Sequence, residues 1–145
     1  MRALCELGTR YREDPRALLT GEQIAAAQDL PWKFLEGILR TLRQAGILAS
    51  QRGADGGFRL DRTPADITVA DVVRALDGPL AAVRGERPED VAYAGSSAHL
   101  GEVWVAMRAA MREVLENTTV ADILDGAHSH RVTEFLEAPG AWQRR

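Results

Sequence analysis

The sequence of residues 20–60 is TGEQIAAAQDLPWKFLEGILRTLRQAGILASQRGADGGFRL. It begins with a short helical segment and a tight turn, and it continues into an amphipathic segment and two short apolar runs separated by glycines. Thr20 and Gln23 have the spacing of a helix-capping box, and Pro31 suits the first turn of the second helix. The pattern predicts two helices followed by a β-hairpin.

The second helix of this pair is expected to have two different faces and to end at Gly46. One face is apolar, whereas the other carries charged residues and a glycine. The apolar residues are Phe34, Leu35, Ile38, Leu39 and Leu42, and the residues of the other face are Lys33, Glu36, Gly37, Arg40 and Arg43.

Two short runs, Ile47–Arg52 and Gly57–Leu60, are expected to form the strands of the hairpin. Helix, turn, helix and hairpin follow one another in a winged helix-turn-helix, in which the second helix enters the major groove of DNA and the hairpin, or wing, contacts phosphates or the minor groove. Glycines between arginines allow a close approach to a polyanion. The alternatives are an ordinary helical hairpin in a structural domain and a wing that binds protein.

The chain has 145 residues, a net charge of −3 and one cysteine, Cys5. This length suits one domain with an appendage, and no apolar run is long enough to span a membrane. Because we find neither a catalytic constellation nor a phosphate-binding loop, we expect a cytoplasmic protein that is not an enzyme. Residues 1–62 contain ten Lys/Arg against eight Asp/Glu, whereas the remainder contains eight against thirteen. A basic stretch on an acidic body favours contact with a polyanion.

The predicted fold class is mostly α with a small β-hairpin wing, a winged helix-turn-helix joined to a long dimerisation helix. A first helix is expected at 1–12, and Thr68 caps a later helix that Gly78 and Pro79 end. We divide the chain into a winged helix-turn-helix domain at 1–78, a loop at 79–96, a long helix with a short final helix at 97–124, and a C-terminal tail at 125–145.

The long helix is expected over about residues 97–117 and carries a wide apolar stripe. Such a stripe can pack into the core of its own chain, against the same helix of a second copy, or against both on different sides. The residues predicted to form a dimer interface are Leu100, Val103, Trp104, Met107, Met111 and Val114.

Four motifs carry a resemblance to a bacterial family. They are Leu35-Glu36 in the second helix, LRQAGIL at 42–48, RGADGGFRL at 52–60 and ITVADVVRALDG at 67–78. Over roughly residues 1–124 the chain resembles the Rrf2 family of winged-helix transcriptional regulators, typified by IscR, NsrR and CymR.

The resemblance implies a homodimer, expected to be a repressor, that binds a partly palindromic DNA operator. In the family, the glutamate that matches Glu36 contacts a base, and the wing arginine that matches Arg52 enters the minor groove, which suits the chemistry of both groups. The alternative for Glu36 is a surface ion pair with Lys33 or Arg40. The candidate DNA-binding residues are Lys33, Glu36, Arg40, Arg43, Arg52, Gly53, Gly56, Gly57 and Arg59.

The chain departs from the family in the segment at 84–100. Members that sense iron, oxygen or nitric oxide carry cysteines there, and this chain has none. We therefore expect no iron–sulfur cluster, no metal site and no other cofactor, and we expect His99, His128 and His130 to be exposed. Two kinds of control remain open: a small ligand in a pocket lined by Tyr93 and Trp104, or a protein partner on the acidic C-terminal half.

Overall fold

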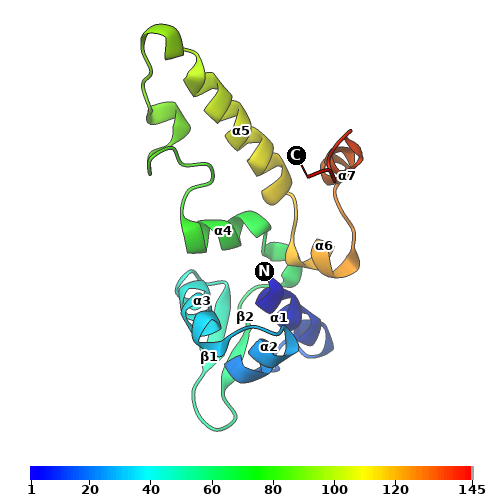
Figure 1. Ribbon diagram of the computed structural model, residues 1–145. Coiled ribbons are helices and arrows are strands. Elements are labelled where there is room, and N and C mark those ends of the chain that lie inside the picture. Colours follow the sequence, from blue (N-terminus) through cyan, green and yellow to red (C-terminus); the bar gives the residue numbers. More distant parts are fainter. Residues whose placement is uncertain (145) are drawn as a thin grey trace.

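The computed structural model describes residues 1–144, which are mostly helical with one two-stranded antiparallel sheet (Figure 1). Short 3₁₀ turns lie at Pro64–Asp66, Pro88–Asp90 and Gly95–Ser97. The longer elements are α1 (Arg2–Glu13), α2 (Gly21–Ala27), α3 (Trp32–Gln44), β1 (Leu48–Gln51), β2 (Gly57–Leu60), α4 (Val69–Asp77), α5 (Leu100–Leu115), α6 (Val120–Asp125) and α7 (His130–Glu137). None of the helices within 1–144 has both the length and the apolar character that a bilayer crossing demands.

Threonine caps fix the starts of three helices. The Thr20 hydroxyl accepts a hydrogen bond from the backbone N–H of Gln23, and the Gln23 side chain accepts one from the backbone N–H of Thr20. The same reciprocal pair forms between Thr68 and Asp71 at α4, and between Thr119 and Asp122 at α6. Each box satisfies two N–H groups that the first helical turn leaves without partners.

One isolated β-bridge lies beside the hairpin. Leu48 pairs with Leu60 and Gln51 with Gly57 across β1 and β2. On the other edge of β2, the Leu19 N–H donates to the Phe58 carbonyl at 3.0 Å, and the Phe58 N–H donates to the Leu19 carbonyl at 2.8 Å. The chain just before α2 is thereby tied to the hairpin, a non-local pairing that the sequence pattern did not predict.

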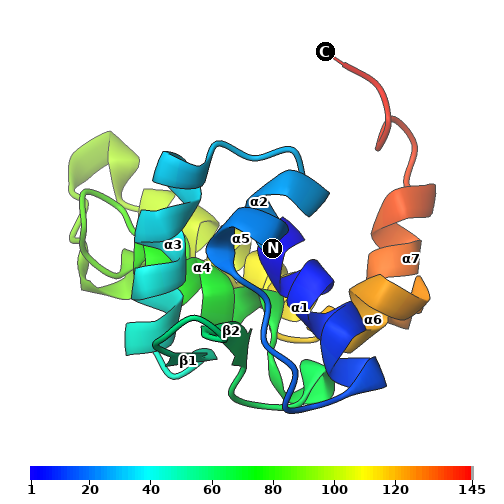
Figure 2. The same cartoon turned by 90° about the horizontal axis from the view of Figure 1, so that it is seen from below.

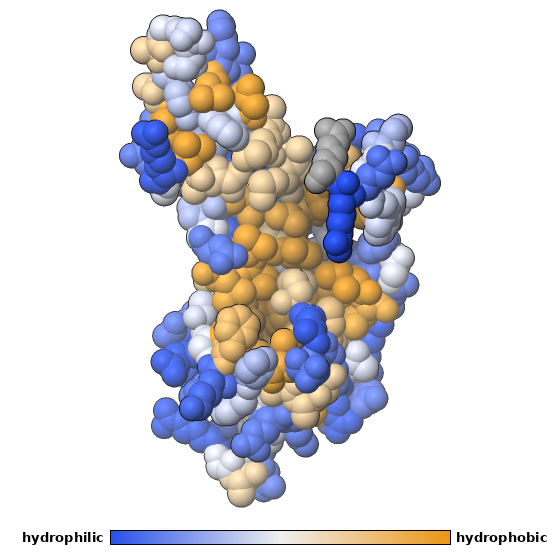
Figure 3. Space-filling model, viewed as in Figure 1, coloured by the Kyte–Doolittle hydropathy of each residue, from blue (hydrophilic) through white to orange (hydrophobic). Residues whose placement is uncertain are grey.

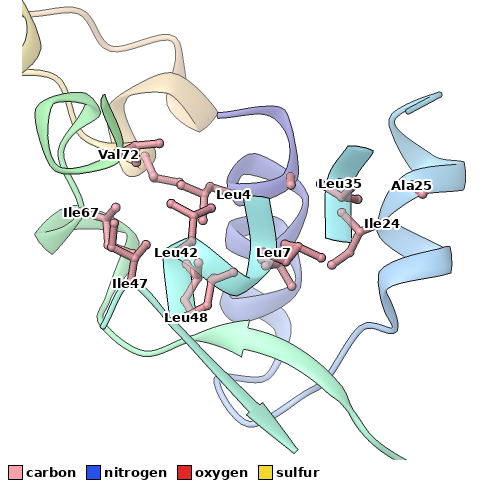
Figure 4. Packing of buried hydrophobic residues seen from close by; sticks show 14 residues of the cluster. Leu4, Leu7, Ile24, Ala25, Leu35, Leu42, Ile47, Leu48, Ile67 and Val72 are labelled. Carbon is pink, nitrogen blue, oxygen red and sulfur yellow. The ribbon is translucent and has the colours of Figure 1, made fainter. Parts of the chain in front are cut away.

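One hydrophobic core joins the hairpin to five helices (Figure 4). Seen from below, α3, α2, α1 and α6 follow one another in a row (Figure 2), and each neighbouring pair is in contact. Val120 of α6 is fully buried in this core, so α6 packs with the winged helix although it follows α5 in the chain. Fully buried side chains of the core are Leu4, Leu7, Ile24, Leu35, Leu39, Leu42, Ile47, Leu48, Leu60, Ile67, Val72 and Val120.

The long helix α5 leaves this core and extends away from it, accompanied by residues 79–99 (Figure 1). Two backbone hydrogen bonds join the start of α4 and the residues just before it to the segment after α5. The Val69 N–H donates to the Thr118 carbonyl at 2.8 Å, and the Val120 N–H donates to the Ile67 carbonyl at 2.9 Å. The long helix begins at Leu100, three residues later than expected, because residues 95–97 form a 3₁₀ turn instead.

Two further expectations need correction. The C-terminal segment at 125–145 is not only a tail, because it contains α7, which the Ser129 side chain caps and which places Val132, Phe135 and Leu136 at helical spacing. Phe34 does not lie on the buried face of α3, since its side chain is 64 % exposed. It occupies the edge of the apolar stripe in the first turn of the helix, beyond the reach of the core.

Candidate nucleic-acid interface

The outward face of α3 carries the first group of candidate residues. Leu35, Leu39 and Leu42 anchor the helix in the core, which turns the opposite face to solvent. The Arg40 guanidinium lies 3.8 Å from the Glu36 carboxylate, and Arg43 donates a hydrogen bond of 3.4 Å to the Ser50 hydroxyl on β1. The exposed residues of this face include Lys33, Glu36, Gly37, Arg40 and Arg43.

The exposed carboxylate of Glu36 has a cation beside it. An ion pair at 3.8 Å between two exposed side chains is weak, so it can open when DNA approaches. Both the base-contacting interpretation and the surface-pair interpretation of Glu36 are therefore compatible with this geometry.

Phe34 adds an aromatic side chain to the exposed surface of α3. A phenyl ring at the start of a helix that enters the major groove is chemically suited to contact a thymine methyl group. The sequence pattern predicted that Phe34 belongs to the apolar face. The only sign in the sequence that its side chain could point elsewhere was its position directly before Leu35, at the edge of the apolar stripe.

The tip of the hairpin presents Arg52 and Gly53 to solvent. Gly53 has a φ of +112°, a region that favours glycine, and a side chain there would meet open space. The Gly56 N–H donates to the Gly53 carbonyl at 3.0 Å and closes the turn. Of the three loop glycines, Gly53 is thus the one free to approach a ligand.

Gly56 and Gly57 are required by the hairpin itself. A Cβ on Gly56 would lie 2.4 Å from the backbone oxygen of Gln51, and one on Gly57 would lie 2.5 Å from that of Leu19. Neither backbone oxygen can move aside easily, so the fold of the hairpin requires glycine at both positions. The sequence pattern assigned all three loop glycines to the approach to DNA. For Gly56 and Gly57, the geometry of the hairpin alone is a sufficient reason for glycine.

Arg59 is more engaged than the other candidate arginines. It is half-buried, it donates a hydrogen bond of 3.1 Å to the Leu60 carbonyl, and it lies 4.0 Å from the Asp61 carboxylate. Arg52 lies at the exposed tip instead. The structure brings α3 and the hairpin together through the core, and the hydrogen bond from Arg43 to Ser50 joins them at the surface.

The apolar stripe of α5 lies on the surface of the single chain. Val103 is 57 % exposed and Met107 is 41 % exposed, while Trp104, Met111 and Val114 are half-buried. Leu100 is also exposed. Hydrophobic residues gather along α5 and continue below it (Figure 3). The predicted interface residues thus share a surface that is available to a partner.

The segment at 84–100 offers oxygen and nitrogen donors but no thiol. Cys5 lies on α1, where partial burial raises the pKa of its thiol. Within residues 1–144, no three His, Cys, Asp or Glu side chains gather closely enough to hold a metal ion. His99 is exposed and lies 3.0 Å from Glu102. This donor set does not fit an iron–sulfur cluster, whose irons need thiolates for most of their ligands.

The comparisons with known proteins agree on one family. Residues 1–126 match the Rrf2 family model, described as an iron-dependent transcriptional regulator. The chain is 40 % identical over 137 residues to a helix-turn-helix-type transcriptional regulator of Mycobacterium tuberculosis, covering 94 % of this chain and 83 % of that protein. It is 35 % identical over 120 residues to CymR of Bacillus subtilis, covering 83 % of this chain and 80 % of CymR.

Two solved structures show the same winged-helix fold. CymR, the global cysteine regulator of B. subtilis, superposes with a TM-score of 0.67 at 31 % identity, covering 86 % of this chain and 91 % of that one. IscR of T. potens gives a TM-score of 0.67 at 31 % identity, covering 88 % and 81 %. The fold and the exposed basic face define a DNA-binding winged-helix regulator. The chain belongs to the Rrf2 family of transcriptional regulators.

Proposed function

We propose that the protein is a homodimeric, sequence-specific repressor that binds a partly palindromic operator in the cytoplasm and has no enzymatic activity. The observation that carries this proposal is the shared exposed surface of α3 and the hairpin tip, where Lys33, Arg40 and Arg52 face solvent on a chain whose net charge is negative. A dimer bound across a promoter would repress by occupying the site that the polymerase needs.

In the proposed complex, α3 enters the major groove. Lys33, Arg40 and Arg43 contact phosphates, Glu36 accepts a hydrogen bond from a cytosine amino group, and Phe34 lies against thymine methyls. Arg52 enters the adjacent minor groove, where a narrow groove concentrates negative potential. Gly53 allows the backbone of the tip to follow, and Gly56, Gly57 and Arg59 hold the shape of the hairpin.

Binding to DNA is tested by fluorescence anisotropy with a duplex selected from a random pool, titrated at increasing salt. Release of counterions from the phosphates should make the affinity fall steeply with salt. Arg52→Ala should weaken binding most at A·T-rich flanks, whereas Arg131→Ala, on α7 and paired with Glu113 and Glu134, should leave it unchanged. Failure to select any duplex, or binding that ignores salt, would favour a module whose winged helix binds protein.

The second copy is proposed to pack on α5. Leu100, Val103, Trp104, Met107, Met111 and Val114 supply an apolar surface that a single chain leaves half open, and an identical helix related by a twofold axis would cover it. The proposal places the two α3 helices on the same side of the dimer, so that each binds one half of the operator.

We also propose that the regulator works without an iron–sulfur cluster and responds to a small ligand or a protein partner. A dimer would contribute only two thiols, both from Cys5 on α1. Protein purified without oxygen should be colourless and free of iron in elemental analysis. A brown preparation with stoichiometric iron and sulfide would contradict this and would implicate Cys5.

The ligand pocket lined by Tyr93 and Trp104 does not match the cavities found. The ring of Tyr93 packs against Gly101, so that a Cβ added to this glycine would lie 3.6 Å from the Tyr93 ring. The indole N–H of Trp104 is buried. Among the cavities of the described residues, three lie near α5, and neither aromatic residue lines any of these.

A further inference from the structure

A cavity of about 560 Å³ lies between the C-terminal end of α4, residues 78–89 and α5. Its volume is within the range of small-molecule sites, roughly 300–1,000 Å³. Four arginines and one glutamate line it together with Leu80, and these side chains are Arg74, Arg87, Arg108, Arg112 and Glu89.

The arginines come from three separate elements but converge on one space. Arg74 belongs to α4, Arg87 to the loop, and Arg108 and Arg112 to successive turns of α5. Like charges gathered in this way repel one another unless carboxylates or a bound anion compensate them.

Two glutamates compensate the cluster only in part. Glu89 lies 2.5 Å from Arg108, and Glu116 pairs with Arg74 and, at 3.0 Å, with Arg112. Hydrogen bonds from Arg112 and Arg74 hold the pKa of Glu116 below its ordinary value, and the hydrogen bond from Arg108 does the same for Glu89. Both carboxylates therefore stay ionised, and four guanidiniums against two carboxylates leave two positive charges.

Arg87 is the arginine best placed to receive a ligand. The ion pairs among residues 1–144 include Arg74, Arg108 and Arg112 but not Arg87, which is exposed at the cavity wall. The charge of Arg87 helps to lower the pKa of Glu89, but Arg87 forms no ion pair with that carboxylate, so its guanidinium can bind an oxyanion through two parallel N–H groups without first breaking an ion pair.

We propose that this cavity binds a small organic anion with at least two acidic groups, and that the anion regulates DNA binding. The inference rests on the proposed function as a ligand-controlled DNA-binding regulator and names the chemical class of the ligand. One acidic group binds Arg87 and another binds the α5 arginines, while Pro79 and Leu80 provide an apolar wall for the body of the molecule.

The position of the cavity connects the ligand to the DNA-binding face. α4 packs against α3, and Arg74 on α4 lines the same cavity as Arg108 and Arg112 on α5. An anion held between Arg87 and the α5 arginines also attracts Arg74, which lines the same cavity, and so favours one angle between α4 and α5. In a dimer built on α5, that angle sets the separation of the two α3 helices, so ligand and operator affinities become coupled.

The binding test uses the full chain and isothermal titration calorimetry with citrate as the probe, carried into the millimolar range at constant ionic strength. Citrate should bind saturably, and Arg87→Gln should weaken it about tenfold, the loss expected for one charge-assisted contact. The matched control is Arg84→Gln, an arginine of the same loop that does not line the cavity and should keep normal binding. Absence of saturable binding, or equal loss in both variants, would overturn the site.

Anisotropy with operator DNA then tests the coupling. At constant ionic strength, citrate should change the operator affinity of the wild-type protein severalfold and should change that of Arg87→Gln much less. An unchanged operator affinity at saturating citrate would overturn the regulatory role. Because both proteins are first measured without citrate, a failure of DNA binding itself would appear there and is distinguishable from a failure of the anion site.

Discussion

The winged-helix half of the molecule and the long helix α5 differ in how much apolar surface one chain can bury. Leu4, Leu39 and Leu60 of the first half have no accessible surface, whereas none of the residues of α5, all described by the structure, is buried. Both regions have apolar residues at helical spacing in the sequence. The difference lies in what packs against each stripe.

The comparison indicates that the winged-helix half, together with α6, buries its apolar side chains within one chain and that α5 does not. Five helices and the hairpin enclose one core, and α6 returns to it after α5. An exposed apolar stripe on a helix is typical of an interface with another protein. Removing the proposed partner of α5 and disturbing the first half test this division separately.

Met107→Glu should have the largest effect, because it places a charge in the centre of the proposed α5 interface. We expect the dimer to separate and the operator affinity to fall roughly a hundredfold or more, since two half-sites are no longer bound together. Light scattering and anisotropy measure the two effects. Ala109→Glu adds the same charge on an exposed face away from the stripe and should leave the dimer intact. A dimer that persists in Met107→Glu would show that the interface lies elsewhere on the chain.

Leu39→Ala should destabilise the first half by about 2–5 kcal/mol, the range for a cavity in a packed core. Urea unfolding followed by circular dichroism measures the change. Phe34→Ala removes a larger side chain from the same helix, but because Phe34 is 64 % exposed the free energy of unfolding should change by only about 0.5 kcal/mol. Equal losses in the two variants would show that Phe34 is packed after all.

The elements that the sequence predicted well are those with local signals. The capping box at Thr20, the cap at Thr68 and the helix end at Gly46 each depend on residues within one turn of a helix, and the structure has all three. Features that depend on distant residues were missed. Leu19 forms a β-bridge only because Phe58 is beside it, and α6 joins the core because α1 and the turn at Pro64–Asp66 offer a surface.

The candidate interface divides in the same way. The exposure of Lys33 and Arg40 follows from helical spacing and was predictable, as was the exposed tip at Arg52. The structural reason for Gly56 and Gly57 was not, because their close neighbours are backbone oxygens that only the folded hairpin brings near. The arginine cavity joins three elements, and no spacing in the sequence indicates it.

Glu36→Ala should change sequence preference without changing stability, because Glu36 lies on the exposed face of α3. If Glu36 contacts a base, preference at one position of each half-site should relax by about 1–3 kcal/mol. Selection from a random duplex pool, followed by sequencing, reads the preference. Gln44→Ala, further along the exposed side of the same helix, serves as the control. An unaltered preference for Glu36→Ala would leave this residue as the surface partner of Arg40.

The smallest effect is expected at the junction of the two regions, where Thr119 caps α6. Thr119→Ala removes a hydroxyl that accepts from the Asp122 N–H at 3.1 Å and donates to the Asp122 carboxylate at 2.7 Å. Loss of such a cap costs about 0.5–2 kcal/mol. Thr119→Ser, which keeps the hydroxyl, should retain most of the stability.

The same variant should alter the acid dependence of folding. Hydrogen bonds from the Thr119 side chain and backbone hold the pKa of Asp122 below its ordinary value of 3.8. A carboxyl whose pKa is lowered by folding adds stability above its unfolded pKa, and this contribution disappears as the pH falls through the folded value. Thr119→Ala removes one of these hydrogen bonds and leaves the one from the backbone N–H at 2.8 Å, so the pKa should rise part of the way back. Urea unfolding at neutral pH and below pH 3.8 measures how much the free energy of unfolding falls on acidification. This fall should be smaller in Thr119→Ala than in the wild type and in Thr119→Ser. An equal fall in the free energy of unfolding on acidification in all three proteins would mean that the backbone hydrogen bond alone lowers the pKa of Asp122.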